Sequence, residues 1–192
     1  MEKLTGLKKI KTAVFISGTG SNLNSIIKFS KTKKSPVSIN LIISNTSEAK
    51  GLRYAYQFAI MNKIFNFKNI KIAEKKILTL LKKENIKFIC LAGFMKILSK
   101  DFIKKFDGRI INIHPSLLPK YKGLNTHGRA IKNEDKFAGC TVHYVTEKLD
   151  SGKIIMQKKI KIASIDNITS LAKKVLKLEH KLYPAAIIKI FT

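Results

Sequence analysis

KTAVFIS (Lys11–Ser17), GTGS (Gly18–Ser21) and NLNSIIKFS (Asn22–Ser30) follow one another directly near the N-terminus. The first stretch is apolar without alternation, which is typical of a strand buried on both faces. The glycines and hydroxyl residues of the second predict a tight turn, and the third is typical of a helix. A strand, a turn and a helix in this order open an α/β fold.

The same alternation continues through the first half of the chain. Further strands are predicted at Val37–Asn45, Lys63–Phe67, Lys87–Ala92 and Arg109–His114. Helices are predicted between them at Glu48–Ile60 and Ile72–Glu84. This order indicates an α/β protein with a mostly parallel central sheet and helices on both faces.

The second half has a different pattern. Phe137–Thr146 and Lys153–Ile162 alternate between apolar and polar residues and are joined by the polar turn Glu147–Gly152. We expect an antiparallel C-terminal strand pair there. A long helix is predicted over Asn167–Lys189, capped by Asp166 or by its own first residue. Since no repeat or low-complexity linker interrupts the 192 residues, we expect a single domain over residues 1–192.

Composition excludes several classes of protein. An apolar share of 45% is too high for a disordered chain, and no apolar run is long enough for a transmembrane helix. Met1–Lys9 lacks the apolar core of a secretory signal, so we expect a loose lead-in. Cys90 and Cys140 form no CxxC pattern and lie in apolar segments, which predicts buried, reduced thiols and a cytoplasmic protein.

The chain carries a formal net charge of +26. Only Arg53, Arg109 and Arg129 among 38 cationic residues are arginines, and the lysines are spread along the chain. Surfaces that read nucleic acid usually include arginine, whose planar fork binds phosphate and guanine in a bidentate manner. We therefore favour a solvated lysine surface, with a field that attracts anionic ligands as the second interpretation. Nucleic-acid binding comes last, and we expect no nucleic-acid partner.

The turn after the first strand has the features of a phosphate-binding loop. Gly18 and Gly20 allow close backbone approach, and free N–H groups at the helix start attract anions. A dinucleotide fingerprint is incomplete, because Leu23 stands at the third glycine position. A purely structural turn is the alternative.

Asn112 and His114 carry the strongest chemical signal. They are two residues apart on a predicted strand, so both side chains project from one face. They stand at its carboxyl end, where open α/β sheets place ligands. An amide donor beside an imidazole suits stabilising an oxyanion and moving a proton. A capping Asn with a structural His is the alternative interpretation.

Asp150 lies in a polar turn, where an aspartate is usually a turn former. It gains a role if the fold brings it to His114, whose imidazole it could orient and charge. His143 could face either side of its strand, and His127 and His180 are less specific. No spacing of these residues is typical of a metal site, so we expect no metal.

Four stretches together resemble the glycinamide ribonucleotide (GAR) formyltransferases of purine synthesis. They are ISGTGSNLNSII from Ile16, LAGFMKILS from Leu91, INIHPSLLPKYKGLNTHGRAI from Ile111 and GCTVHYVTEKLDSGKII from Gly139. Their order and spacing match over nearly the whole chain, from about Lys11 to Phe191. The resemblance implies a Rossmann-like sheet, with a phosphate-binding half at about residues 1–110 and a folate-cleft and catalytic half at about 111–192.

The family resemblance also assigns residues. The catalytic Asn, His and Asp fall on Asn112, His114 and Asp150. The GAR-binding positions fall on Gly18, Thr19, Gly20, Ser21, Asn22 and Glu179. The folate-binding positions fall on Leu91, Met95, Lys96, Ile97, Leu98, Val145 and Asp150. Lys96 stands where the family often has Arg, and a folate-side Arg has no clear counterpart near Asn69–Lys71.

The reaction implied is direct transfer of a formyl group from 10-formyltetrahydrofolate, a co-substrate, to the amine of GAR, by a monomer or homodimer without a membrane partner. Two other classes stay open. One comprises siblings with the same catalytic trio: formyltetrahydrofolate deformylases, which carry an additional N-terminal domain, and methionyl-tRNA formyltransferases, which carry an additional C-terminal domain. The other is a non-enzymatic nucleotide- or RNA-binding module, which would leave the trio without a use.

Overall fold

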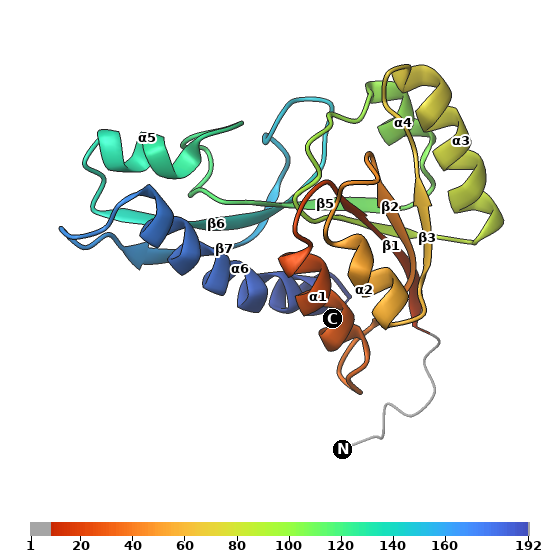
Figure 1. Cartoon of the computed structure of the whole chain (residues 1–192), viewed down its shortest axis with the longest axis horizontal. Helices are drawn as coiled ribbons and strands as arrows, with labels where there is room; N and C mark the ends of the chain where they lie inside the picture. The colour runs from red at the N-terminus through yellow and green to blue at the C-terminus, as the bar shows by residue number, and fades with distance from the viewer. Residues whose placement is uncertain (1–8, 192) are drawn as a thin grey trace.

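The structure, a computed structural model, describes residues 9–191. In that range seven strands form one sheet in the order β3-β2-β1-β4-β5-β6-β7 (Figure 1). The strands are β1 (Ile10–Ile16), β2 (Val37–Ser44), β3 (Met61–Ile64), β4 (Phe88–Leu91), β5 (Arg109–His114), β6 (Phe137–Tyr144) and β7 (Ile154–Lys161). The first five are parallel, whereas β6 pairs antiparallel with both β5 and β7. The predicted α/β class and the antiparallel β6–β7 pair are confirmed.

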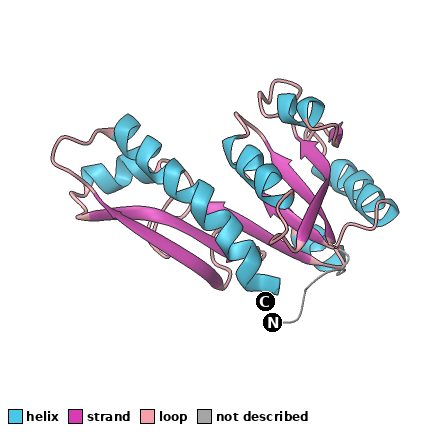
Figure 2. Ribbon diagram, turned by 90° about the horizontal axis from the view of Figure 1, so that it is seen from below, coloured by secondary structure: helices cyan, strands magenta, loops and turns pink. Residues whose placement is uncertain are grey.

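Helices pack on both faces of this sheet (Figure 2). They are α1 (Ser21–Ser30), α2 (Leu52–Gln57), α3 (Ile70–Lys83), α4 (Lys100–Lys105), α5 (Thr126–Lys132) and α6 (Ile168–Phe191). Alternate residues of β1 enter two separate cores: Val14 and Ile16 pack with α1, α2 and α6, whereas Ala13 and Phe15 pack with α3 and α4. A parallel strand covered on both faces explains why the β1 segment shows no polar alternation.

Two predicted elements had wrong boundaries, and two short helices were not predicted. The helix predicted over Glu48–Ile60 is only Leu52–Gln57, because Gly51 donates its N–H to the Gly18 carbonyl at 2.9 Å and holds the preceding residues in a turn. The strand predicted at Lys63–Phe67 lies at Met61–Ile64, where it pairs with β2. The short helices α4 and α5 were not predicted.

The two cysteines and the start of the last helix lie as expected. Cys90 and Cys140 are buried and form no disulfide, as predicted, and burial raises the pKa of the Cys140 thiol to about 12. The side chain of Asn167 accepts the Ser170 N–H at 2.9 Å and so caps α6. Within residues 9–191, no helix combines the length and apolar character needed to cross a bilayer. The predicted lead-in at Met1–Lys9 lies, except for its last residue, outside the described residues.

Candidate active site

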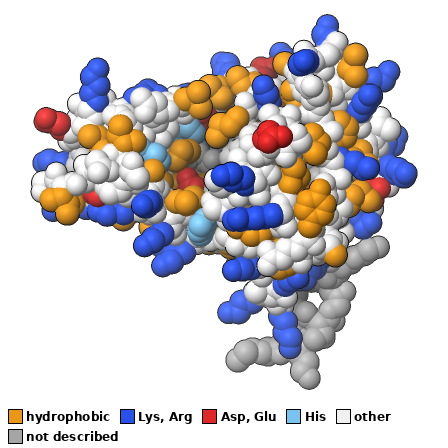
Figure 3. Space-filling view, in the orientation of Figure 1, with side chains coloured by type: hydrophobic (Ala, Val, Ile, Leu, Met, Phe, Trp, Pro, Cys, Tyr) orange, Lys and Arg blue, Asp and Glu red, His pale blue; other side chains and the backbone are white. Residues whose placement is uncertain are grey.

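A cavity of about 1100 Å³ lies at the carboxyl ends of β1, β4 and β5. Its walls come from the loops after these strands, from the turn between β6 and β7, and from one face of α6. In the space-filling view the visible face is hollowed in its middle, and histidine side chains lie around the hollow (Figure 3). Every candidate site residue predicted from the sequence lines this cavity.

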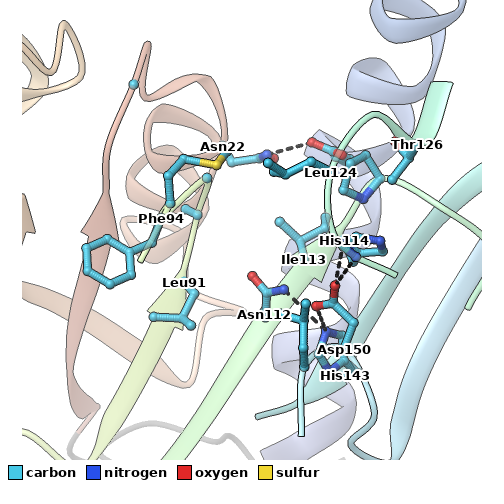
Figure 4. A pocket seen from close by; sticks show the side chains of 18 of the residues that line it. Asn22, Leu91, Phe94, Asn112, Ile113, His114, Leu124, Thr126, His143 and Asp150 are labelled. Carbon is cyan, nitrogen blue, oxygen red and sulfur yellow. Dashed lines mark hydrogen bonds and ion pairs between the residues drawn. The ribbon is translucent and has the colours of Figure 1, made fainter. Parts of the chain in front are cut away.

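Asn112, His114 and Asp150 lie together in its floor (Figure 4). Strand periodicity turns Asn112 and His114 to the same side of β5, as predicted. The turn after β6 brings the Asp150 carboxylate Oδ2 to 3.3 Å from His114 Nδ1. The same oxygen accepts the Gly123 N–H at 2.9 Å, so two chain segments hold this carboxylate in place.

The surroundings of Asp150 favour its ionised form. Burial would raise the pKa of this carboxyl, but the neighbouring His143 ring, the hydrogen bond from the Gly123 N–H and the charge of His114 together lower it below its usual value. His114 Nε2 lies 2.8 Å from the carbonyl oxygen of Tyr121. Both ring nitrogens of His114 therefore face acceptor oxygens, an arrangement that suits an imidazolium with two N–H donors.

His143 is the site residue that sequence reasoning did not assign. It lies on β6 directly opposite Asn112 in the antiparallel register, and its Nε2 is 3.3 Å from Asn112 Nδ2 and 3.5 Å from Asp150 Oδ1. The side chains of residues directly opposite in such a pair lie on one face of the sheet. The register of β5 against β6 was the missing signal.

The predicted phosphate loop leads from β1 into α1. Gly20 has φ +75, and a Cβ there would lie 2.5 Å from the Gly51 Cα, so the position requires glycine. The first turn of α1 contains no acidic residue, and the ten-residue helix starts at Ser21 beside the cavity. Its free N–H groups offer a place for an anion there.

Glu179 closes the same side of the cavity from α6. Its Oε2 accepts a hydrogen bond from Asn22 Nδ2 at 2.7 Å, so the loop after β1 and the last helix are joined at this point. Burial raises the pKa of Glu179 to about 7, although the Asn22 hydrogen bond opposes the rise. Near neutral pH this carboxyl therefore exists in both protonation states.

The cavity also has an apolar wall, in the segment that the family resemblance assigns to folate. Its lining residues include Leu91, Met95, Ile97, Leu98 and Val145. Met95 is 64% exposed although it is a large apolar residue, as expected of a surface that a flat ring could cover. The Ser17 hydroxyl accepts the Met95 N–H at 2.7 Å and fixes this loop to the end of β1. Lys96 supplies a cation on the same loop.

No group of three or more His, Cys, Asp or Glu residues within 9–191 is placed to hold a metal ion. A mostly parallel sheet, with a helix start and an Asn–His–Asp cluster lining one cavity at the strand ends, is typical of an α/β enzyme. The chain belongs to the formyl transferase family, whose model matches residues 10–187.

Similar proteins agree with this assignment. The chain is 43% identical over 185 residues to the phosphoribosylglycinamide formyltransferase of Haemophilus influenzae, covering 95% of this chain and 87% of that protein. It is 40% identical to a human trifunctional purine biosynthetic protein, adenosine-3, over 94% of this chain, but spans only 18% of that protein's length. The phosphoribosylglycinamide formyltransferase structure from Brucella melitensis has a TM-score of 0.90 at 42% identity, covering 95% of this chain and 96% of that one.

Proposed function

We propose that this chain transfers the formyl group of 10-formyltetrahydrofolate to the amine of phosphoribosylglycinamide (GAR), in the synthesis of the purine ring. The observation that carries the proposal is the His114–Asp150 pair at 3.3 Å with Asn112 beside it. A phosphate-type loop and an apolar wall line the same cavity. The similarity to the Haemophilus influenzae enzyme over most of both chains supports the same reaction.

The cavity fits two substrates. A volume of about 1100 Å³ exceeds what one drug-sized ligand usually fills, about 300–1000 Å³. The loop and helix start on the α1 side would hold the GAR phosphate, through Gly18, Thr19, Gly20, Ser21 and Asn22. Glu179 would contact the rest of that nucleotide. The apolar wall and Lys96 would hold the folate ring and its acidic tail. The cluster at His114 then lies where the two reacting ends meet.

Each residue of the cluster then has its own role in the reaction. Asn112 and the charged His114 donate hydrogen bonds to the formyl oxygen as the GAR amine attacks the formyl carbon. Asp150 keeps His114 oriented and charged. A C–N bond to GAR forms, the C–N bond to the folate breaks, and the proton lost by the amine goes to the departing folate nitrogen, carried through this cluster. Holding both substrates in register supplies further acceleration.

Both ring nitrogens of His114 already have partners, so the substrate must replace one of them. His114 Nδ1 faces Asp150, and His114 Nε2 faces the Tyr121 carbonyl. The formyl oxygen must therefore replace the Tyr121 carbonyl as the partner of the Nε2–H. We assign the exchange to this side, because a charge-assisted contact to a carboxylate is stronger than one to a neutral carbonyl.

We further propose that residues 1–192 act as one formyltransferase domain in the cytoplasm, as a monomer or homodimer. The buried thiols of Cys90 and Cys140, which form no disulfide, support a reducing compartment.

The test offers three acceptors in parallel to the purified chain with 10-formyltetrahydrofolate: GAR, water and initiator methionyl-tRNA. We expect kcat/KM for GAR to exceed the other two rates by orders of magnitude. Dominant release of formate would instead indicate a deformylase, and dominant labelling of the tRNA would indicate a tRNA formyltransferase. No turnover with any acceptor would support the binding-module alternative.

A further inference from the structure

His143 contacts two of the three catalytic candidates. This residue is 2% exposed and lies on β6 opposite Asn112 of β5. Figure 4 shows its ring between Asn112 and Asp150, with dashed contacts to both. A buried imidazole in this position is a polar group whose two nitrogens both need partners.

The partners of the ring define where its hydrogen lies. His143 Nδ1 is 2.9 Å from the carbonyl oxygen of Tyr144, and a carbonyl only accepts, so Nδ1 carries the hydrogen. In a neutral imidazole the other nitrogen then carries a lone pair and only accepts. At 3.3 Å the amide nitrogen of Asn112 can donate to that lone pair, whereas the amide oxygen of Asn112 would be repelled by it.

We propose that His143 is a positioning residue for formyl transfer, which holds the Asn112 amide with its nitrogen toward His143 Nε2 and its second N–H free for the formyl oxygen. The inference rests on the proposed function. Without this acceptor the amide could turn by half a rotation and present its carbonyl oxygen to the developing negative charge. That orientation replaces a donor by a repelling dipole.

A proton on Nε2 would change the partner. The nitrogen would then donate to Asp150 Oδ1 at 3.5 Å and could no longer accept from Asn112. The neutral form of His143 is therefore the form that orients Asn112, whereas the charged form of His114 is the one that stabilises the oxyanion. Two neighbouring histidines thus perform different tasks because their acceptors differ.

His143→Leu removes the acceptor at similar volume. Because Asn112 stays but loses its fixed orientation, we expect kcat to fall about 10- to 100-fold, in the range that a misplacement of about 1 Å causes. The KM values for both substrates should change by no more than about threefold, since the contact acts on the transition state. His143→Gln places an amide oxygen near the lost Nε2, and we expect it to recover part of the rate.

A double-mutant cycle distinguishes positioning from a merely structural contribution. Formyl transfer is measured for the wild type, His143→Leu, Asn112→Ala and the double variant. If His143 acts through Asn112, His143→Leu lowers kcat by no more than about twofold once Asn112 is alanine. Losses that multiply in the double variant would overturn the inference. The proposed function is judged separately, by the wild type and by Asn112→Ala alone.

A control variant and an NMR measurement test the role of His143 independently of the double-mutant cycle. His180→Leu is the matched control, since His180 lies on α6 outside the cavity lining, and its kcat should stay at the wild-type value. Side-chain ¹⁵N NMR of the wild type reads the tautomer without any variant: we expect a protonated Nδ1 and a bare Nε2 on His143. A protonated Nε2 with a bare Nδ1 at neutral pH would overturn the inference even if every variant failed to fold.

Discussion

Glu179→Gln offers a quantitative check on the electrostatics of the cavity. Burial raises the pKa of this carboxyl from its ordinary 4.5 to about 7. Because the folded state binds the proton more tightly, Glu179 lowers the free energy of unfolding progressively as pH rises through that window. At about 1.4 kcal/mol per pKa unit, the full loss is about 3 kcal/mol above pH 7, of which about 2 kcal/mol develops between about pH 5.5 and 8.

The assay is urea unfolding, followed by circular dichroism, of the wild type and of Glu179→Gln across this pH range. Gln resembles the protonated carboxyl, so the variant should gain about 2 kcal/mol relative to the wild type between about pH 5.5 and 8. Glu134→Gln, at an exposed position, is the control and should give no such trend. Parallel stability curves for the wild type and Glu179→Gln would refute the reasoning, because they would mean that Glu179 is already ionised in the folded protein at pH 5.5 or below.

Three kinetic predictions follow from the site. His114→Ala should lower kcat by about 1000-fold or more with GAR binding largely kept, measured by single-turnover transfer and by calorimetric titration with GAR; a near-normal kcat would remove its catalytic assignment. Replacing Ser21 and Asn22 by alanine should raise KM for GAR far more than KM for the folate, and an unchanged KM for GAR would contradict the phosphate-loop interpretation. Lys173→Ala should raise KM for GAR about tenfold, because Lys173 lines the cavity from α6 and GAR is anionic. The control is Lys177→Ala, on the same helix but outside the cavity lining. Equal effects of the two substitutions on KM would indicate a general charge effect and contradict the assignment of Lys173.

The α/β alternation could be predicted because each long element has a strong local pattern. The run at β1 is apolar on both faces, and α6 has a cap and a long periodic segment. The short helices lack such a long periodic segment: α4 spans six residues, fewer than the windows in which helical periodicity becomes visible. Its start depends on tertiary contacts, since Ser99 caps the helix while its backbone N–H bonds to Glu74 of α3 at 2.7 Å.

The site residues also differ in how far the sequence alone could predict them. Strand periodicity alone predicts that Asn112 and His114 share a face, because they are two residues apart, whereas their roles came from the resemblance. Asp150 could be placed only through the resemblance, since a turn aspartate carries no signal for the strand end it approaches. His143 required the pairing register, because a one-residue slip would turn it to the opposite face. The arrangement of residues that are close in the sequence can thus be predicted from the sequence. Contacts between residues far apart in the chain depend on how the strands pair in the sheet.

Direct transfer of the formyl group to GAR is the central claim, and an isotope experiment tests it. The purified chain is given 10-formyltetrahydrofolate labelled with ¹³C in the formyl group, together with GAR and an excess of unlabelled formate. The account predicts fully labelled formyl-GAR, with one tetrahydrofolate released for each product molecule. Label that leaves as free formate, with GAR unchanged, would contradict it.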